Sequence, residues 1–438
     1  MILRSQAARP LLGSVRLPGD KSISHRAAIL AASADGLSRI DGFLRAGVTQ
    51  VMLDSLTSAG VKWRWEEESL VVEGNGRNGF PAGARPLYCG NSATTFRLLS
   101  GMLAGRPPWI TGAGSEFILD GSDQLRRRPM GRVTEPLRNM GARVRSVEKT
   151  DCAPLGITPA ELQGIEYVLP VASAQVKSAI LLAGLSAAGS TLVQEPSPSR
   201  DHTERLLRSL GVRLEEAPCR VRVFPIERPL PPLAIRVVGD FSSAAFPIVA
   251  ALIVPGSEII LRDIGLNPRR TGLLAVLRRM GADIAVLDRS EMDGEARGDL
   301  RVRAGPLAST VVEGAEVVDM IDEFPVLAIA AARAEGTTRV RGAGELRHKE
   351  SDRISMLVAE LRKIGIAVEE AADGFSIEGP AEIHGGPVDS HGDHRLAMAL
   401  AVAGLVSKGG VAIDGAECIT ESFPDFSERM NSLGAQLG

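Results

Sequence analysis

The stretch Leu17-Pro-Gly-Asp-Lys-Ser-Ile-Ser-His-Arg26 runs directly into the apolar residues 27–31. Its Pro-Gly pair interrupts any preceding strand or helix, and Asp20 and the serines after it suit the start of a helix. The segment that follows is rich in Ala, Ile and Leu, which favours helix over strand. The sequence therefore predicts a buried helix with Lys21 and Arg26 at or inside its first turn.

The charges at this helix start point to an anionic ligand. The free N–H groups of a first turn and the positive end of the helix dipole already favour negative charge. Lys21 and Arg26 add positive charge there, which is unfavourable unless a phosphate or carboxylate binds. The alternative is that both side chains extend into solvent, as long basic side chains do elsewhere.

Length and composition indicate a folded protein with two domains. The 438 residues exceed what one ordinary hydrophobic core contains. Hydrophobic residues make up 44% of the chain and charged residues 24%. The aromatic content is 4% and the formal net charge is -3, and both argue against binding of nucleic acid, which uses basic surfaces and stacking rings.

Cysteine usage and hydropathy give expectations about location. The four cysteines are far apart and show no C-x-x-C spacing, so we predict neither a metal site nor a disulfide framework. The N-terminal residues have no apolar core of a signal peptide, and no run approaches the roughly eighteen apolar residues of a membrane span. We therefore expect a cytoplasmic protein without a membrane partner.

Two sequence patterns recur along the chain and indicate internal repeats. In the first, a helical segment is followed by glycine and then by a strand-like segment, which is typical of a helix C-terminus. These glycines follow one another at intervals of 81, 70, 70, 84 and 69 residues, at Gly60, Gly141, Gly211, Gly281, Gly365 and Gly434.

The second pattern is a polar start followed by a helix of small apolar residues that ends at glycine. Such helices are apolar nearly all round and are therefore expected to be buried. The six copies are residues 21–36, 91–105, 173–189, 242–256, 322–336 and 393–409, with short strands predicted at 69–73 and 234–238.

Six repeat units divide evenly between two domains. The segment 237–241 near the middle of the chain and Gly19 near its start are the expected crossings between them. We therefore predict an α/β protein with one discontinuous domain of residues 1–19 plus 240–438 and a second domain of residues 20–239.

Polar side chains gather at the starts of the predicted buried helices. Helix capping alone explains Asn91, Ser92 and Thr94, and Asp322 is expected to be an N-cap. The hydroxyl and amide groups of residues 173–175 suit a sugar-like or cyclitol ring.

Basic residues accompany these helix starts. The Arg126-Arg-Arg128 run offers one guanidinium group for a bidentate carboxylate contact. Lys349 and Arg353, four residues apart, are predicted to share a helical face and to hold an anion between them. Seven candidate cations and two carboxylates result, namely Lys21, Arg26, Arg128, Arg200, Lys349, Arg353 and Arg395 with Asp322 and Glu350. This set predicts a site for a polyanionic substrate with general acid–base groups and no metal ligands.

Together these motifs resemble the 5-enolpyruvylshikimate-3-phosphate (EPSP) synthase family, the 3-phosphoshikimate 1-carboxyvinyltransferases. The resemblance covers nearly the whole chain in family order, through DKSISHR (20–26), CGNSATTFR (89–97), RRRPM (126–130), SAQVKSAILLAG (173–184), SRDHTERLL (199–207), IDEFPVLAIAAA (321–332), LRHKESDR (346–353) and DHRLAMA (393–399). It implies a two-domain inside-out α/β barrel of six βαβαββ units, three per domain, with the active site in the cleft between the domains.

The resemblance also implies a reaction. The 5-hydroxyl of 3-phosphoshikimate attacks C2 of phosphoenolpyruvate while C3 is protonated, and the tetrahedral adduct then loses phosphate. Asp322 resembles the base toward the hydroxyl, and Glu350 with Lys21 resembles the groups that handle protons at C3 and the leaving phosphate. No cofactor is implied, and the family expectation is a monomer.

The same resemblance implies two sets of substrate contacts. For 3-phosphoshikimate they are Lys21, Ser22, Arg26, Ser173, Ala174, Gln175, Arg200, Asp322 and Lys349. For phosphoenolpyruvate they are Lys21, Ala93, Arg128, Gln175, Arg353 and Arg395.

Three positions depart from the family pattern. Ala93 stands where many members have glycine, and its methyl group predicts glyphosate tolerance by crowding a bulkier analogue. Glu421 replaces a phosphate-binding lysine of many members, which puts tight phosphoenolpyruvate binding in doubt. The loop Arg45-Ala-Gly-Val-Thr49 lacks the acidic residues usual before the following helix.

Two other functions compete with this interpretation. One is the related enolpyruvyl transferase that acts on UDP-N-acetylglucosamine, whose usual cysteine would fall near Asp123. The other is a catalytically impaired, anion-binding paralogue, suggested by Glu421 and the loop 45–49. Turnover of the two acceptor substrates distinguishes these possibilities.

Overall fold

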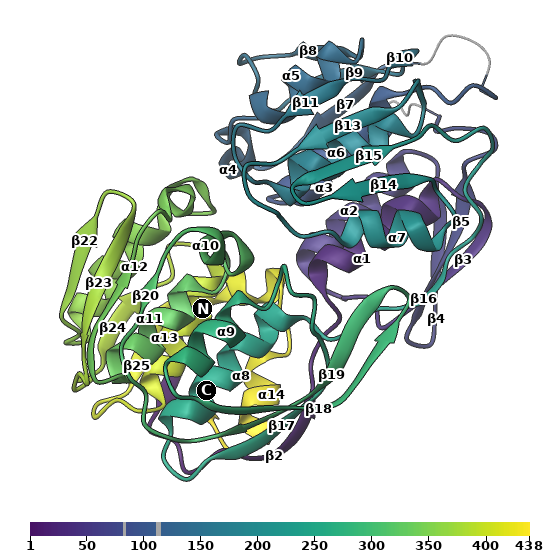
Figure 1. The fold of residues 1–438 in the computed structure, drawn as a ribbon. Coiled ribbons are helices and arrows are strands. Elements are labelled where there is room, and N and C mark those ends of the chain that lie inside the picture. Colours follow the sequence, from purple (N-terminus) through teal and green to yellow (C-terminus); the bar gives the residue numbers. More distant parts are fainter. Residues whose placement is uncertain (82–84, 111–114) are drawn as a thin grey trace. The chain divides into compact units, whose positions relative to one another are not determined.

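The computed structural model describes residues 1–81, 85–110 and 115–438. The chain folds as two compact units. Unit 1 comprises Met1–Pro18 and Val238–Gly438, and unit 2 is the continuous segment Gly19–Val237. Figure 1 shows the elements of each unit, and each is described by itself below.

Among the described residues of unit 2, all three four-stranded sheets have the same strand pattern. In each, the first strand is parallel to the second, and the remaining pairs are antiparallel. The first two sheets are β16 (Ala234–Arg236), β3 (Asp35–Asp41), β5 (Ser69–Asn75) and β4 (Lys62–Glu66), then β6 (Leu87–Tyr88), β7 (Phe117–Asp120), β9 (Leu155–Thr158) and β8 (Arg143–Ser146). The third is β11 (Glu166–Val168), β13 (Thr191–Gln194), β15 (Arg220–Val223) and β14 (Leu214–Ala217).

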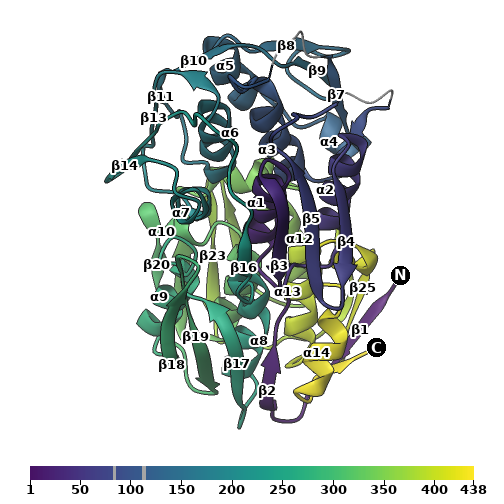
Figure 2. The same ribbon diagram turned by 90° about the vertical axis from the view of Figure 1, so that its right-hand side faces the viewer.

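Unit 1 repeats this pattern in three further sheets. They are β2 (Leu12–Arg16), β17 (Glu258–Gly265), β19 (Glu295–Arg303) and β18 (Asp283–Met292), then β20 (Val311–Val312), β21 (Gly336–Val340), β23 (Gly374–Gly379) and β22 (Val368–Ala371). The third is β24 (Gly386–Asp389), β25 (Val411–Asp414), β1 (Leu3–Gln6) and β26 (Gln436–Leu437). Figure 2 shows β2 beside β17, and β1 beside β25.

Three apolar helices form the interior of each unit. In unit 1 they are α8 (Phe241–Ile253), α11 (Phe324–Arg333) and α13 (His394–Gly404), which contact one another and each pack on a sheet. In unit 2 they are α1 (Lys21–Ala32), α3 (Ala93–Ala104) and α6 (Ala174–Gly184). Almost every residue of the six helices is buried, as the sequence predicts for helices that are apolar nearly all round.

These helices are shorter than the sequence pattern indicates. The prediction extended the first one to Gly36, but α1 ends at Ala32 and Gly36 lies within β3. Likewise α6 ends at Gly184, five residues before Gly189. The reason is that the chain turns directly into the next strand, so the glycine serves the turn or the strand rather than the helix.

Six more polar helices alternate with the buried ones. They are α2 (Gly47–Ser58), α5 (Gly131–Asn139), α7 (His202–Ser209), α9 (Gly272–Arg279), α12 (Arg353–Lys363) and α14 (Phe426–Ser432). The glycine two residues after the end of each helix has a positive φ, from +78° at Gly211 to +107° at Gly434. This confirms the predicted helix ends, because the left-handed conformation there favours glycine.

The chain passes between the units at two Gly-Asp pairs. Strand β2 belongs to unit 1 but leads through Gly19 and Asp20 into α1, whereas β16 belongs to unit 2 and leads through Gly239 and Asp240 into α8. A Cβ atom at Gly19 would lie 1.9 Å from the carbonyl oxygen of Gly42, so a side chain there would collide with backbone. Unit 1 is thus completed by strands β1 and β2, which precede the continuous segment of unit 2 in the sequence.

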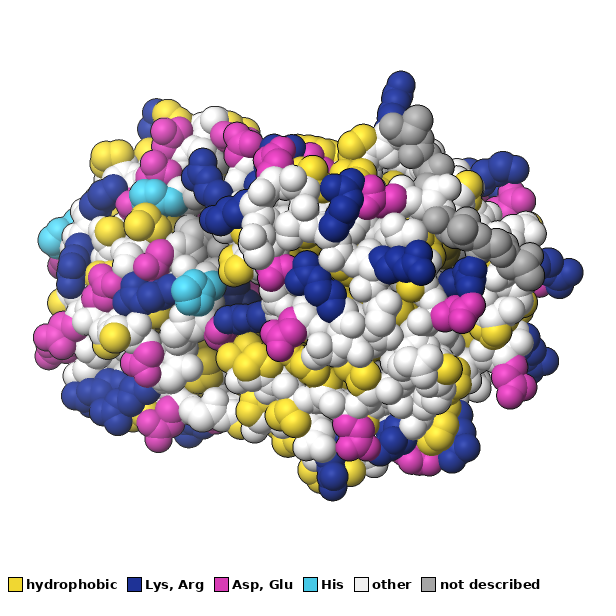
Figure 3. Space-filling view, turned by 90° about the horizontal axis from the view of Figure 1, so that it is seen from above, with side chains coloured by type: hydrophobic (Ala, Val, Ile, Leu, Met, Phe, Trp, Pro, Cys, Tyr) yellow, Lys and Arg dark blue, Asp and Glu magenta, His cyan; other side chains and the backbone are white. Residues whose placement is uncertain are grey.

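The remaining elements are short. They are α4 (Asp123–Arg126), α10 (Ala315–Asp319), the pair β10 (Leu162–Gln163) and β12 (Ala187–Ala188), and the 3₁₀ helices η1 (Gly344–His348) and η2 (Ala416–Glu421). On the face drawn in Figure 3, basic and acidic side chains are interspersed. Among the helices of the described residues, none has both the length and the apolar character needed to cross a membrane.

Candidate functional site

In unit 1 the three buried helices begin at acidic residues, and each of these faces an arginine. Asp240 caps α8 and lies 2.9 Å from Nη2 of Arg270. Asp393 caps α13 and accepts a 2.7 Å hydrogen bond from Nε of Arg353. Both guanidinium groups are 2% exposed, so these ion pairs are held away from solvent. Carboxylates at helix N-termini are favourable because they meet the positive end of the helix dipole.

The third helix, α11, corrects one prediction. Its N-cap is Glu323 rather than Asp322, because the helix begins at Phe324 and carries Pro325 at its second position, where no N–H is needed. Oε1 of Glu323 accepts a hydrogen bond from the Ser242 hydroxyl and lies 3.9 Å from Nη1 of Arg395. Asp322 is therefore not occupied by capping.

Asp322 instead lies among all three arginines of this cluster. Its Oδ1 is 3.4 Å from Nη1 of Arg353, and its Oδ2 is 3.5 Å from Nη1 of Arg270 and 3.6 Å from Nη2 of Arg395. The Asp322 side chain is 15% exposed, whereas each arginine is nearly inaccessible. A carboxylate is thus surrounded by buried cations and still reachable from solvent.

Glu350 and Lys349 lie in the segment that joins η1 to α12. The predicted shared helical face of Lys349 and Arg353 is wrong, because η1 ends at His348 and Asp352 caps a new helix that begins at Arg353. Arg353 is also not an unbalanced cation, since Nη2 donates a 2.5 Å hydrogen bond to Oε2 of Glu350. Lys349 and Arg353 therefore do not form the like-charge pair on one helical face that would favour an anion between them.

Carboxylates outnumber guanidinium groups in this part of unit 1. The described cluster contains Asp240, Asp322, Glu323, Glu350 and Asp393 against Arg270, Arg353 and Arg395. The expected surplus of cations is thus absent from this cluster. Burial by itself raises the pKa of Asp393, but the charge and hydrogen bond of Arg353 together with the charge of His394 hold the pKa below the ordinary value. Burial opposes the charge of Arg353, but Asp393, Glu350 and Asp322 together raise its pKa.

In unit 2, α1 begins as the sequence predicts. Asp20 accepts a 2.9 Å hydrogen bond from the Ile23 N–H, and Lys21 is the first helical residue. Nδ1 of the buried His25 donates to the Lys21 carbonyl at 2.8 Å, and Nε2 faces the Ser92 hydroxyl at 3.4 Å. Burial, together with the charges of Lys21 and Arg26, lowers the pKa of His25 to about 4. Neutral His25 therefore joins the start of α1 to that of α3.

Arg26 is buried, so the alternative in which it extends into solvent is wrong. Arg26 is 3% exposed, and its Nε donates a 2.7 Å hydrogen bond to Oγ1 of Thr203. Nη2 donates to Oγ of Ser178 at 2.8 Å, and Nη1 to the Ser22 carbonyl at 3.0 Å. Arg26 thereby connects α1 with α6 and α7.

The starts of α3 and α6 are joined by side chains. Ser92 and Ser173 cap the two helices through the N–H groups of Thr95 and Val176. Ala93 and Ala174 are the first helical residues, and Ala93 is 4% exposed. Gln175 donates to Oγ1 of Thr94 at 2.9 Å and accepts from Nη1 of Arg97 at 2.6 Å.

The arginine run 126–128 is divided by its contacts. Arg126 makes a bidentate pair with Asp120 at 2.9 and 2.6 Å, so it is engaged within the protein. Arg127 is exposed. The Nε atom of Arg128 is buried and has no hydrogen-bond partner among the described residues. Of the three, Arg128 therefore best fits an anionic ligand.

A buried ionic cluster in unit 2 was not predicted. Nζ of Lys177 lies 2.7 Å from Glu195 and 2.8 Å from Glu204, and all three side chains are at most 5% exposed. Burial opposes the charge of Lys177, but the two glutamates outweigh it and raise its pKa. Burial also raises the pKa of Glu204.

Residues 47–49 of the expected loop form the first turn of α2, and this helix start is stabilised without acidic residues. The Arg45 guanidinium stacks over the Trp65 ring at 3.9 Å, and Thr49 accepts from the Ala46 N–H at 3.1 Å.

Glu421 lies at the end of η2. Burial raises the pKa of the Cys418 thiol, and the negative charges of Asp393 and Glu421 act in the same direction.

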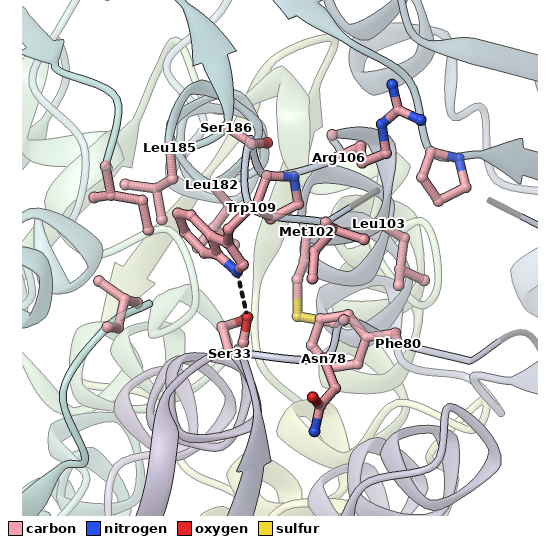
Figure 4. A pocket seen from close by; sticks show the side chains of 18 of the residues that line it. Ser33, Asn78, Phe80, Met102, Leu103, Arg106, Trp109, Leu182, Leu185 and Ser186 are labelled. Carbon is pink, nitrogen blue, oxygen red and sulfur yellow. Dashed lines mark hydrogen bonds between the residues drawn. The ribbon is translucent and has the colours of Figure 1, made fainter. Parts of the chain in front are cut away.

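The apolar cavity in unit 2 lies elsewhere. About 300 Å³ in volume, it is lined by residues at the C-terminal ends of α1, α3 and α6, including Ser33, Leu103 and Leu185. Figure 4 shows Trp109 beside it, and the indole N–H donates to the Gly76 carbonyl at 2.8 Å. None of the predicted site residues lines this cavity, because all of them are at or near the opposite helix ends or in other segments.

Comparison with known proteins agrees with the motifs. The family model described as EPSP synthase (3-phosphoshikimate 1-carboxyvinyltransferase) matches residues 5–430. A 3-phosphoshikimate 1-carboxyvinyltransferase of Geobacter sulfurreducens is 46% identical over 434 residues, covering 99% of both chains. One of Xanthomonas euvesicatoria is 48% identical over 429 residues, covering 98% of this chain and 95% of the relative.

The fold is also that of a solved relative. The structure of an EPSP synthase from Acinetobacter baumannii superimposes with a TM-score of 0.88 at 39% identity, covering 100% of this chain and 99% of the other. This confirms the α/β fold class predicted from the sequence, the two-domain inside-out barrel. The chain belongs to the EPSP synthase family.

Proposed function

We propose that this chain transfers the enolpyruvyl group of phosphoenolpyruvate to the 5-hydroxyl of 3-phosphoshikimate, giving 5-enolpyruvylshikimate 3-phosphate and phosphate. Family membership supports the reaction. The observation that carries it in the structure is Asp322, a partly accessible carboxylate within 3.6 Å of three buried arginines. Such a carboxylate can accept a proton beside groups that bind an anionic substrate.

The reaction proceeds by addition and elimination. The 5-hydroxyl oxygen bonds to C2 of phosphoenolpyruvate, the hydroxyl proton passes to Asp322, and C3 gains a proton to become a methyl group. The adduct then loses phosphate from C2 and a proton from C3, which restores the double bond. We assign the C3 proton and the leaving phosphate to Glu350 and Lys21.

Phosphoenolpyruvate binding draws on arginines that already have partners. Arg353 is anchored by contacts of 2.5 and 2.7 Å to Glu350 and Asp393, but its contact with Asp322 is 3.4 Å long. An incoming phosphate or carboxylate can therefore take the loosely held N–H groups while the anchors remain. As those N–H groups turn away from Asp322, the carboxylate becomes a stronger base.

The remaining substrate contacts are proposals from the family motif. For phosphoenolpyruvate they are Lys21, Ala93, Arg128, Gln175, Arg353 and Arg395. For 3-phosphoshikimate they are Lys21, Ser22, Arg26, Ser173, Ala174, Gln175, Arg200, Asp322 and Lys349. We propose that the helix starts of both units contribute to one active site in a cleft, and that the enzyme is a cytoplasmic monomer.

Phosphate release tests the proposal and both alternatives. We expect release with phosphoenolpyruvate and 3-phosphoshikimate together, and none with either alone or with UDP-N-acetylglucosamine as acceptor. Turnover with the UDP-sugar instead would make the chain the related transferase. Tight binding of both substrates without phosphate release would make it an impaired paralogue.

A further inference from the structure

The buried cluster of Lys177, Glu195 and Glu204, here called the Lys177 triad, has features that stability alone does not explain. Its three side chains are between 3% and 5% exposed. Removing charges from water costs more than their attraction commonly returns, so buried ion pairs are a weak source of stability. A role in fixing the position of a neighbouring segment therefore explains the cluster better than stability does.

The triad binds one particular residue, Ser199. Lys177 Nζ donates to the Ser199 carbonyl at 3.4 Å, Glu195 Oε1 accepts from the Ser199 N–H at 3.4 Å, and Glu195 Oε2 accepts from the Ser199 hydroxyl. The N–H, the carbonyl and the side chain of one buried residue are thus all held. Arg200 follows directly and is partly exposed, so the triad fixes the backbone from which its side chain extends.

The same helices hold a second substrate candidate. Ser178 and Thr203 are the sequence neighbours of Lys177 and Glu204, and their hydroxyls are 2.7 Å apart. Both bind the guanidinium group of Arg26. The contact between α6 and α7 therefore consists of an ionic part next to Arg200 and a hydroxyl part next to Arg26.

We propose that the Lys177 triad is a positioning device that holds Arg200, through Ser199, for the phosphate group of the acceptor substrate. The inference rests on the proposed function, since that function supplies the phosphate ligand. Lys177, Glu195 and Glu204 do not touch substrate in this proposal. Glu195 is the residue through which positioning acts, because it binds both Lys177 and Ser199.

Glu204 provides a matched control inside the triad. It is as buried as Lys177 and makes the same kind of contact with it, at 2.8 Å. Among the described residues it makes no hydrogen bond to Ser199. Glu195→Met and Glu204→Met each leave Lys177 with one carboxylate, so the two variants remove equal charge but only the first releases Ser199.

The experiment compares these variants in the full-length enzyme. Isothermal titration calorimetry measures the binding of the acceptor, 3-phosphoshikimate, and phosphate release measures kcat and the Michaelis constant for each substrate. For Glu195→Met we expect the acceptor to bind about tenfold more weakly, in both Kd and KM, with kcat and the KM for phosphoenolpyruvate within about twofold of the wild type. Glu204→Met keeps the wild-type affinity, although its melting temperature falls by a similar amount.

Each other outcome decides the question. Equal effects of the two variants on acceptor binding, or none, overturn positioning through Glu195 and leave the proposed function intact. If Glu195→Met does not fold, Ser199→Ala replaces it, because it removes the hydroxyl contact while the ionic triad stays, and an unchanged Kd then rejects the proposal. A wild-type enzyme that neither binds nor converts 3-phosphoshikimate refutes the proposed function itself and the positioning with it.

Discussion

Nη1 of Arg353 lies 3.4 Å from Oδ1 of Asp322, while Nε of the same guanidinium group donates a 2.7 Å hydrogen bond to Asp393. The two contacts differ in strength, because charge-assisted hydrogen bonds are short when fully formed. Asp393 therefore anchors the arginine, and Asp322 faces the part of it that is least committed.

Asp322→Asn is expected to lower kcat by about 10²- to 10⁴-fold, because the amide cannot accept the hydroxyl proton. The affinity for phosphoenolpyruvate is expected to stay the same or to increase, since a negative charge beside Arg353 and Arg395 is removed. Steady-state kinetics and calorimetric titration with phosphoenolpyruvate measure both effects. A raised KM for phosphoenolpyruvate with unchanged kcat would assign Asp322 to substrate binding instead.

Acid sensitivity should depend on His25. Its pKa is lowered to about 4 in the folded protein, below the 6.5 of an unfolded chain, so the unfolded state binds more protons between these values and stability falls as the pH falls from 6.5 to 4. From pH 7 to pH 5 this group is expected to remove about 2 kcal/mol from the free energy of unfolding. His25→Asn, whose amide can still donate to the Lys21 carbonyl, should lose less stability over that range.

Urea unfolding at pH 7 and pH 5 checks this. The control is His384→Asn, a histidine substitution at a side chain that is 65% exposed. Equal acid sensitivity of the wild type and His25→Asn would show that other groups dominate.

Ala93 predicts weak inhibition by glyphosate. The residue is buried at the first position of α3, and an added methyl group in a packed site costs about 1–3 kcal/mol against a bulkier ligand. Ala93→Gly should therefore lower the glyphosate inhibition constant by about tenfold or more, while the KM for phosphoenolpyruvate changes little. Inhibition assays on both forms decide, and a wild type already inhibited at low concentration would refute the prediction.

Glu421 should weaken phosphoenolpyruvate binding. It ends η2, which packs against α13, the helix whose first turn carries Arg395. Glu421→Lys is expected to lower the KM for phosphoenolpyruvate severalfold and to make that KM more sensitive to salt. Glu417→Lys is the control, because Glu417 lies on the same 3₁₀ helix but its side chain is 65% exposed and pairs with the N-terminal amine of Met1. Equal effects of both variants would indicate a general charge effect.

The repeat and the fold class could be predicted because they depend on local rules. A glycine after a helix marks the left-handed residue that ends it, and Gly60 and Gly434 both have a positive φ. Helices of small apolar residues must be buried, and all six were. Helix length was harder to predict, because the glycine that closes the pattern can lie in the next strand, as Gly36 does.

The candidate site was only partly predictable. Sequence motifs indicated Asp322, Arg353 and Arg395, and the structure brings these three together. Arg270 was missed, because its contact with Asp322 joins residues 52 positions apart and no motif marks it. Asp240 could have been found, since Gly239-Asp240 repeats the Gly19-Asp20 pair at the other crossing.

Two predictions were wrong because local sequence preferences do not determine where these two helices begin. Capping preferences favour Asp322 over Glu323, but the helix start was set by the packing of Phe324 and by Pro325. Spacing alone likewise placed Lys349 and Arg353 on one helix, although a 3₁₀ helix ends before them and a new N-cap intervenes. The Lys177 triad was missed because hydrophobic patterning gives no sign of a lysine that is buried by two distant glutamates.

The strands with which β1 and β2 pair have a consequence for biosynthesis. Strand β1 pairs with residues 411–413 and 436–437, and β2 with residues 258–262, whereas Gly19–Val237 is one continuous segment. Because nascent chains emerge N-terminal end first, unit 2 can fold on the ribosome while β1 and β2 are still unpaired. Strands β1 and β2 thus leave the exit tunnel long before their partner strands do, so chaperone capture and early aggregation should concentrate on these two strands.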